Sequence, residues 1–69
     1  MPQPTPASPH RRIIRLRTVR EMTSLSRNAV ESLEAQGDFP RRVQLSRRIA
    51  GWYEDEVLAW LAGLPRRAP

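Results

Sequence analysis

Arginine supplies every basic side chain of this chain, and four arginines fall in the segment FPRRVQLSRRIAGW, residues 39–52. The pairs Arg41-Arg42 and Arg47-Arg48 flank a four-residue insert. A guanidinium group stays charged at physiological pH and can donate two parallel hydrogen bonds to one phosphate. With a net charge of +5 and an isoelectric point near 11.5, this excess of arginine indicates a polyanionic partner, with nucleic acid favoured over a membrane surface.

The sequence lacks the residue combinations that catalysis or metal binding would need. It contains no cysteine, and its one histidine, His10, lies in a proline-rich stretch without a second ligand nearby. No nucleophile and base are placed together, and the glycines lie at expected helix ends or in the basic segment, not in a phosphate-binding loop. We therefore expect no enzyme: no catalytic residue, no metal site and no cofactor.

Composition divides the chain into one small domain between two tails. Residues 1–12 are rich in proline and small polar side chains, which predicts a disordered tail. Residues 13–64 form the expected domain, whose core should be marginal at this size, and residues 65–69 form a frayed basic C-terminus. The absence of cysteine, of a signal-peptide pattern and of an apolar run of about 18 residues predicts a cytoplasmic protein with no membrane partner.

The first predicted elements of secondary structure begin near Ile14, before the arginine-rich segment. Ile14 and Leu16 alternate with arginines, which predicts a short extended segment with one face inward. Thr18 is the expected N-cap of a short helix, because Glu21 three residues later completes a capping-box pattern. A tight turn then leads into a second helix.

The second helix is predicted over residues 27–36, with Ser26 as its N-cap and Gly37 just past its end. Its apolar side chains share one face: Ala29, Val30 and Leu33. The opposite face carries polar or short side chains: Arg27, Asn28, Glu31, Ser32 and Ala35. Two helices joined by a three-residue turn match a DNA-binding helix-turn-helix. An ordinary helical hairpin with a solvated face is the alternative.

The arginine-rich segment follows this second helix directly. Val43 and Leu45 alternate with polar residues, so one side of a strand can pack while the other faces outward. Residues 46–48 can turn, and the sequence IAGW, residues 49–52, can return as the second strand. Such a ribbon must pack on the helices, because an isolated hairpin is unstable in water. The pattern predicts a basic wing that lies on the phosphate backbone or along a groove.

A third helix closes the predicted domain. Four apolar residues recur at helical spacing: Val57, Trp60, Leu61 and Leu64. The acidic residues Glu54 to Glu56 occupy the first turn, where the helix dipole favours anions. Trp52 and Trp60 are expected in the core and not on a base-stacking surface, because the chain has few other aromatic side chains.

From about Ile14 to Leu64, the sequence resembles the AlpA family of prophage regulators, which are winged helix-turn-helix proteins related to MerR and excisionase DNA-binding domains. The matching stretches are IIRL, LSRNAVESLEAQGDFPRRVQL, SRRIAGW and EDEVLAWL. The resemblance implies a transcriptional regulator or an excisionase-type recombination directionality factor of a prophage or other mobile element. It also implies that the second helix enters the major groove while the hairpin contacts the backbone or minor groove. Glu31-Ser32 departs from the family, which commonly has Tyr-Arg there, so the target sequence cannot be inherited.

The expected fold is therefore mostly α with a small β-hairpin: a short strand, a helix, a turn, a recognition helix, a two-stranded wing and a C-terminal helix. The expected DNA-binding residues of the recognition helix are Ser26, Arg27, Asn28, Glu31 and Ser32, and those of the wing are Arg41, Arg42, Gln44, Arg47 and Arg48. Double-stranded DNA should be bound by several copies on repeated sites, because one small domain covers few base pairs. The alternative is a protein-interaction module that binds an integrase or polymerase subunit through the C-terminal helix.

Overall fold

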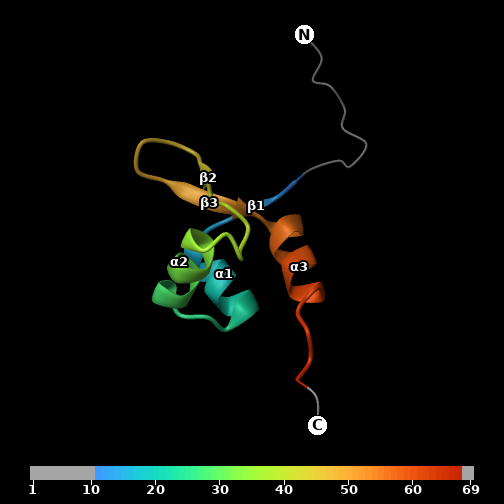
Figure 1. Cartoon of the computed structure of the whole chain (residues 1–69). Helices are drawn as coiled ribbons and strands as arrows, with labels where there is room; N and C mark the ends of the chain where they lie inside the picture. Colours follow the sequence, from blue (N-terminus) through green and yellow to red (C-terminus); the bar gives the residue numbers. More distant parts are fainter. Residues whose placement is uncertain (1–10, 68–69) are drawn as a thin grey trace.

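In the described part of the chain, three short strands form one antiparallel sheet in the order β1-β3-β2, and three helices pack around it (Figure 1). The computed structural model describes residues 11–67. The strands are β1 (Ile13–Ile14), β2 (Val43–Gln44) and β3 (Ala50–Tyr53), and the helices are α1 (Leu16–Thr23), α2 (Arg27–Ala35) and α3 (Glu54–Ala62). This is the predicted fold class, with the element order of a winged helix-turn-helix. The β2–β3 hairpin is the wing, defined here as residues 41–50.

The start of α1 differs from the prediction. The helix begins at Leu16, and Arg15 is its N-cap without a side-chain hydrogen bond, so Thr18 lies inside the helix. Leu16 belongs to the helix and packs against the core, whereas only Ile13 and Ile14 form the extended segment. The capping-box pattern was misleading because pairing of Ile14 with Trp52 ends the strand just before Leu16.

The turn and the second helix follow the prediction closely. Ser24 ends α1 in the left-handed region with φ 64°, a conformation that lets the chain reverse within three residues. The Ser26 hydroxyl oxygen accepts a hydrogen bond from the Ala29 amide at 3.1 Å, which confirms this residue as the N-cap of α2. Gly37 follows the end of α2 with φ 81°, as a C′ glycine does.

The β1–β3 pairing was not predicted, and it depends on one glycine. Ile13 pairs with Tyr53 and Ile14 with Trp52. A Cβ atom at Gly51 would lie 2.6 Å from Ile13 Cγ2 and 2.8 Å from the Ile14 carbonyl oxygen. The two strands can therefore approach this closely only because residue 51 has no side chain.

The core lies between the sheet and all three helices. Its buried residues are Ile14, Val19, Val30, Phe39, Trp52 and Val57. The expectation that Trp52 is a core residue is confirmed, since it is 1% exposed and its indole N–H donates to the Pro40 carbonyl at 3.2 Å. Trp60 is half-buried, packs edge-on against Phe39 with ring centroids 4.8 Å apart, and donates to the Asp38 carbonyl.

The apolar stripe predicted for the third helix is only partly correct. Val57 is fully buried, and Trp60 and Leu61 pack against the core. Leu64 does not join them, because α3 ends at Ala62 and leaves the Leu64 side chain 46% exposed. Leu58, on the outer side of the helix, is also exposed.

The described part of the chain begins at Arg11, just before β1. The predicted proline-rich tail lies outside the described residues except for Arg11 and Arg12. Arg11 binds Asp55 at 3.0 Å and Glu56 at 3.0 Å, and its guanidinium lies over the Tyr53 ring. These contacts attach the chain preceding β1 to the first turn of α3.

Within residues 11–67, none of the helices has the length and apolar character that crossing a membrane requires.

Candidate nucleic-acid interface

The outward face of α2 presents the polar side chains that the sequence assigned to base reading. Arg27, Asn28, Glu31 and Ser32 are exposed, whereas Val30 on the opposite face is completely buried. The Ser26 side chain is engaged as the helix cap. This helix therefore offers donors and acceptors to solvent on a rigid element whose other side is fixed in the core.

Arg27 and Glu31 form an ion pair along this face, with the guanidinium Nε 3.3 Å from a carboxylate oxygen. This is the intrahelical pair that the sequence allowed as an alternative role for Glu31. Such exposed pairs at a spacing of four residues contribute only about 0.2–0.5 kcal/mol. Either side chain can therefore leave the other at little cost if a ligand offers a better partner.

The wing places its second arginine pair at its tip. Arg47 and Arg48 lie in the turn between β2 and β3 and are exposed. Leu45 was expected to pack inward, but it is 47% exposed because β2 ends at Gln44, before the hairpin tip. The Gln44 side chain donates to the backbone carbonyls of Ser46 and Ile49, so in the free protein it closes the turn.

Arg42 anchors the wing to α2. Its backbone amide and its guanidinium both donate to the Glu34 carboxylate, each with a closest distance of 2.7 Å. The same guanidinium lies 4.9 Å from the centroid of the Trp52 ring. Partial burial acts to raise the pKa of Glu34, but the hydrogen bonds from Arg42 outweigh it, so that the pKa lies below its usual value. The sequence did not reveal this clamp, because eight residues and a helix end separate its partners.

We expect Glu34→Gln to destabilise the domain at neutral pH by about 1–3 kcal/mol, because a neutral amide replaces a carboxylate that accepts charged hydrogen bonds. The folded-state pKa lies below the ordinary value of 4.5. The carboxylate's contribution is therefore complete well above pH 4.5 and is lost as the pH falls through the folded-state pKa. Urea denaturation of both proteins should show a gap at pH 7 that narrows as the pH is lowered below 4.5.

Glu21→Gln is the matched control, since Glu21 is exposed and lies 3.7 Å from Arg17 in a solvated pair. Its effect should stay within about 0.5 kcal/mol at either pH. A gap between Glu34→Gln and wild type that is equally large at pH 3 and pH 7 would show that the clamp does not depend on the carboxylate's charge.

Ion pairing divides the arginines into two groups. Of the twelve arginines, Arg11, Arg12, Arg17, Arg27 and Arg42 lie within 4.0 Å of an acidic side chain. The remaining seven have no such partner within residues 11–67: Arg15, Arg20, Arg41, Arg47, Arg48, Arg66 and Arg67. Three of the four wing arginines are thus available to a ligand, and Arg42 is the exception. Arg15 and Arg20 of α1 belong to the same available group, although the sequence analysis did not select them.

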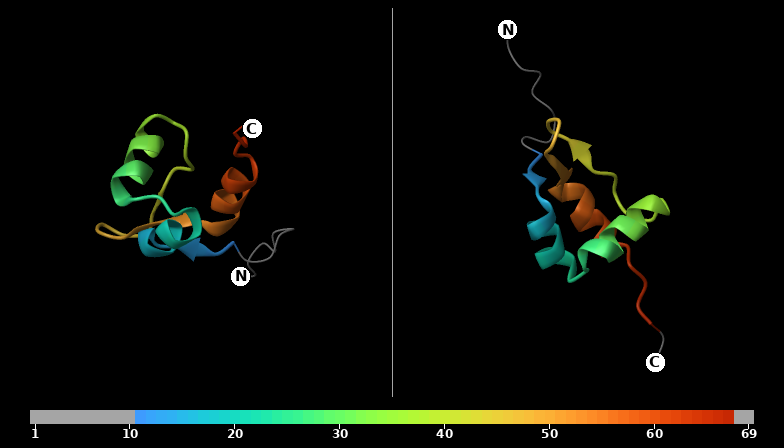
Figure 2. Two further views of the ribbon diagram at one scale, coloured as in Figure 1. Left: turned by 90° about the horizontal axis from the view of Figure 1, so that it is seen from below. Right: turned by 90° about the vertical axis from the view of Figure 1, so that its left-hand side faces the viewer.

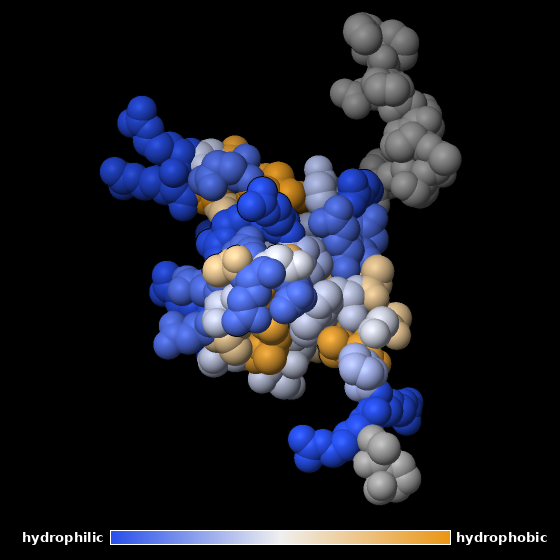
Figure 3. All heavy atoms as spheres, in the orientation of Figure 1, coloured by the Kyte–Doolittle hydropathy of each residue, from blue (hydrophilic) through white to orange (hydrophobic). Residues whose placement is uncertain are grey.

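The wing and α2 lie on the same side of the molecule, and α3 lies on the opposite side (Figures 1 and 2). Hydrophilic side chains project on that side over both elements (Figure 3). The structure therefore brings the two groups of predicted site residues onto one surface.

The part of the chain that the structure describes holds no cluster of three or more side chains able to bind a metal ion.

Comparison with known proteins agrees with this architecture. Residues 12–64 match the family described as prophage CP4-57 regulatory protein (AlpA). The chain belongs to the AlpA family of prophage regulatory proteins. A relative described as uncharacterized protein ORF88 of Enterobacteria phage P4 is 33% identical over 70 residues, which cover 90% of this chain and 80% of the relative. The AlpA match spans every strand and helix described above, and the family is regulatory and not enzymatic.

Proposed function

We propose that this AlpA-family protein binds double-stranded DNA in a sequence-specific manner, at the nucleoid, as a regulator of a prophage or other mobile element. One observation carries the proposal: the exposed polar face of α2 and the unpaired wing arginines share one side of the molecule. A recognition helix in the major groove with a wing on the neighbouring backbone requires this arrangement.

Different residues provide the affinity for DNA and the sequence specificity. Arg41, Arg47 and Arg48 neutralise phosphates, which gives affinity with little sequence information. Arg42 holds the wing against α2 through Glu34, so that the wing and the helix meet the DNA in a fixed relation. Arg27 and Asn28 read base edges in the major groove, since arginine pairs with guanine and asparagine with adenine by bidentate hydrogen bonds.

The test is a selection from randomised duplex DNA with the purified protein. A sequence-specific binder enriches one short motif, and repeated copies of that motif at fixed spacing would show that several molecules bind together. Recovery of random duplexes without a motif would reject sequence-specific binding, while failure to retain any duplex at low salt would reject DNA binding altogether.

The same selection, carried out with wild type and with Glu31→Ala, tests whether Glu31 reads a base. Its carboxylate lies among arginines on the reading face, where it repels phosphates but can accept a hydrogen bond from the cytosine N4 amino group. We expect Glu31→Ala to relax the preference at one or two positions of the motif, by about 1–3 kcal/mol at a C·G pair, while binding to random DNA holds or tightens. If both proteins select identical motifs, the ion pair with Arg27 is the whole role of Glu31.

A regulator of transcription and an excisionase-type directionality factor use the same surface, and the position of the site decides between them. Footprinting on the upstream region of the protein's own gene supports transcriptional regulation if the protected site overlaps a promoter. Protection beside an integrase recombination site supports a role in excision.

A second candidate function is a protein-interaction module that uses α3. It is favoured by two exposed apolar side chains, Leu58 of α3, 51% exposed, and Leu64 just after it, 46% exposed. The helix α3 itself lies on the side of the molecule away from the wing (Figure 1). The two roles are compatible, because α3 does not share the basic surface. Retention of an integrase or polymerase subunit by a protein that ignores all duplex DNA would favour this second function.

A further inference from the structure

A hollow of about 300 Å³ lies between the start of α1, the outer face of α2 and the wing. Its charged lining consists of five arginines and one glutamate, namely Arg15, Arg17, Arg27, Arg42, Arg48 and Glu31. Five positive charges therefore face one negative charge in a space open to solvent. This feature is called the α1–wing hollow below. It is a concentrated cationic site that the sequence analysis did not predict.

Ion pairing leaves two of the five arginines available. Arg17, Arg27 and Arg42 are paired with Glu21, Glu31 and Glu34 respectively. Arg15 and Arg48 have no acidic partner within residues 11–67. They come from two different elements that line the hollow, Arg15 from the N-cap of α1 and Arg48 from the wing. An anion in the hollow would therefore have an unpaired guanidinium available from each of these elements.

The start of α1 adds to this positive potential. Arg15 makes no side-chain cap, and the first turn of α1 contains no acidic residue. The amide groups at a helix start carry a partial positive charge that favours anions, and here no side-chain carboxylate or hydroxyl offsets it. Because Arg15, Leu16 and Arg17 all line the hollow, this end of α1 borders it directly.

The size and position of the hollow suit a backbone phosphate. Its volume of about 300 Å³ leaves room for one phosphodiester group and its hydration. Glu31 and Arg27 of the reading face form part of its wall, so an anion held there lies beside the bases that α2 would read.

We propose that the α1–wing hollow seats one backbone phosphate of duplex DNA, with Arg15 and Arg48 donating to the same phosphate from its two sides. This inference rests on the proposed function and extends the interface from two elements to three. Arg15 thereby positions the recognition helix: it ties α1 to the phosphate that the wing also holds, and so fixes the depth and angle of α2 in the groove.

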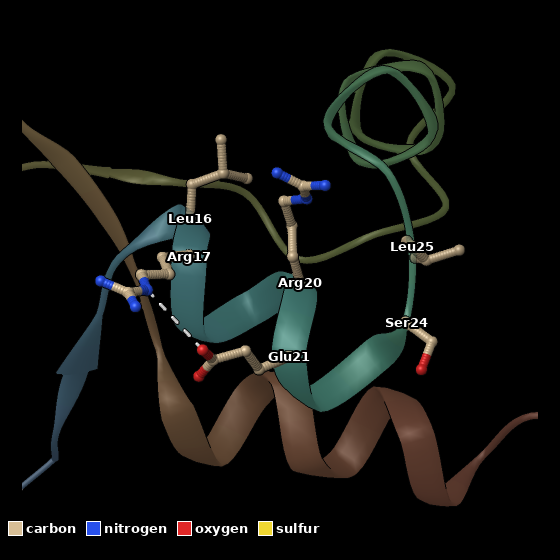
Figure 4. A pocket seen from close by; sticks show the side chains of 6 residues that line it. All are labelled: Leu16, Arg17, Arg20, Glu21, Ser24 and Leu25. Atoms are coloured by element: carbon tan, nitrogen blue, oxygen red, sulfur yellow. Dashed lines mark ion pairs between the residues drawn. The ribbon is translucent and has the colours of Figure 1, made fainter.

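A neighbouring hollow on α1 supplies the matched control. It shares Leu16 and Arg17 with the α1–wing hollow, but its remaining lining includes Arg20 and Leu25 and no residue of the wing. Arg20 points between Leu16 and Leu25, while Arg17 turns toward Glu21 (Figure 4). Arg20→Ala therefore removes one unpaired positive charge from the same helix without touching the proposed phosphate seat.

The experiment is a double-mutant cycle of binding to the duplex that wild type selects. Arg15→Ala and Arg48→Ala should each weaken binding about tenfold, because each removes a charged hydrogen bond to phosphate. The double variant should lose far less than the hundredfold product, since both side chains hold one group. Arg20→Ala combined with Arg48→Ala should be multiplicative. Circular dichroism checks that all variants remain folded, as expected for exposed side chains.

A chemical change in the DNA tests the same phosphate from the other side. A scan of neutral methylphosphonate substitutions should find one position that weakens wild type about tenfold and leaves the Arg15→Ala, Arg48→Ala double variant unaffected. Arg15→Ala that binds like wild type overturns the inference, and so does multiplicative loss for Arg15 with Arg48, which would mean separate phosphates. In both cases the proposed function stands, because the selection from randomised duplex DNA tests it separately: it fails if wild type enriches no motif or retains no duplex.

Discussion

Replacing both tip arginines of the wing, Arg47→Ala with Arg48→Ala, should weaken binding to every duplex by about 3 kcal/mol or more, roughly a hundredfold. Both side chains are exposed and lack an acidic partner within residues 11–67, so their loss removes phosphate contacts and leaves the fold intact. The slope of log affinity against log salt should flatten by about 0.9 per lost contact, or about 1.8 in total. Titrations at several salt concentrations, on specific and random duplexes, measure both quantities.

Arg66→Ala with Arg67→Ala is the control for net charge. It removes the same two charges from the total of +5, but from the segment beyond α3, away from the wing (Figure 1). We expect a small, uniform loss from weaker long-range attraction, with most of the salt slope retained. An unchanged salt slope in the wing variant would remove the wing from the binding mechanism.

Trp52→Ala should unfold most of the protein. The side chain is 1% exposed, pairs its strand with β1 and supports the Arg42 guanidinium on its ring. Truncating a buried tryptophan costs about 3–5 kcal/mol, which approaches or exceeds the total stability expected of so small a domain. Far-UV circular dichroism at 25 °C should show a large loss of helical signal, and urea should no longer produce a cooperative transition.

Two further substitutions test whether unfolding is caused by the loss of the buried Trp52 ring. Leu58→Ala truncates an exposed side chain of α3 and should change stability by no more than about 0.5 kcal/mol. Trp52→Phe keeps a ring in the core but loses the hydrogen bond to Pro40, so it should be folded and intermediate in stability. A Trp52→Ala protein that keeps a cooperative transition but loses DNA binding would place Trp52 in the interface, against the core assignment.

The sequence predicted the ends and the buried face of α2, because these features depend on residues that are close together in the chain. Ser26 and Gly37 mark the ends of α2 because capping and left-handed backbone depend on one or two residues. The inward face of α2 follows from helical periodicity, which Val30 confirms. Thr18 failed as a cap because the start of α1 is determined by where β1 stops, and that depends on a strand far along the chain.

Contacts between distant segments set the remaining part of the candidate site. The Glu34–Arg42 clamp and the placement of Arg15 and Arg48 around one hollow depend on how the wing folds back over α2 and α1. A charge pattern shows that arginines are abundant, but not which of them are neutralised by a neighbour. The structure shows that Arg42 is held by Glu34 and supports the wing, whereas Arg15 is unpaired within residues 11–67 and joins the candidate interface.

The pairing of Ile13 with Tyr53 also governs when the domain can form during its synthesis. A ribosome releases the chain from its N-terminus, so α1 and α2 emerge before β3, and until then Trp52 is missing from the core that they share. A polypeptide that terminates early thus carries the recognition helix without the means to hold it in shape. We expect such a fragment to be cut by proteases, and under the proposed function it would not compete with the full-length protein for DNA.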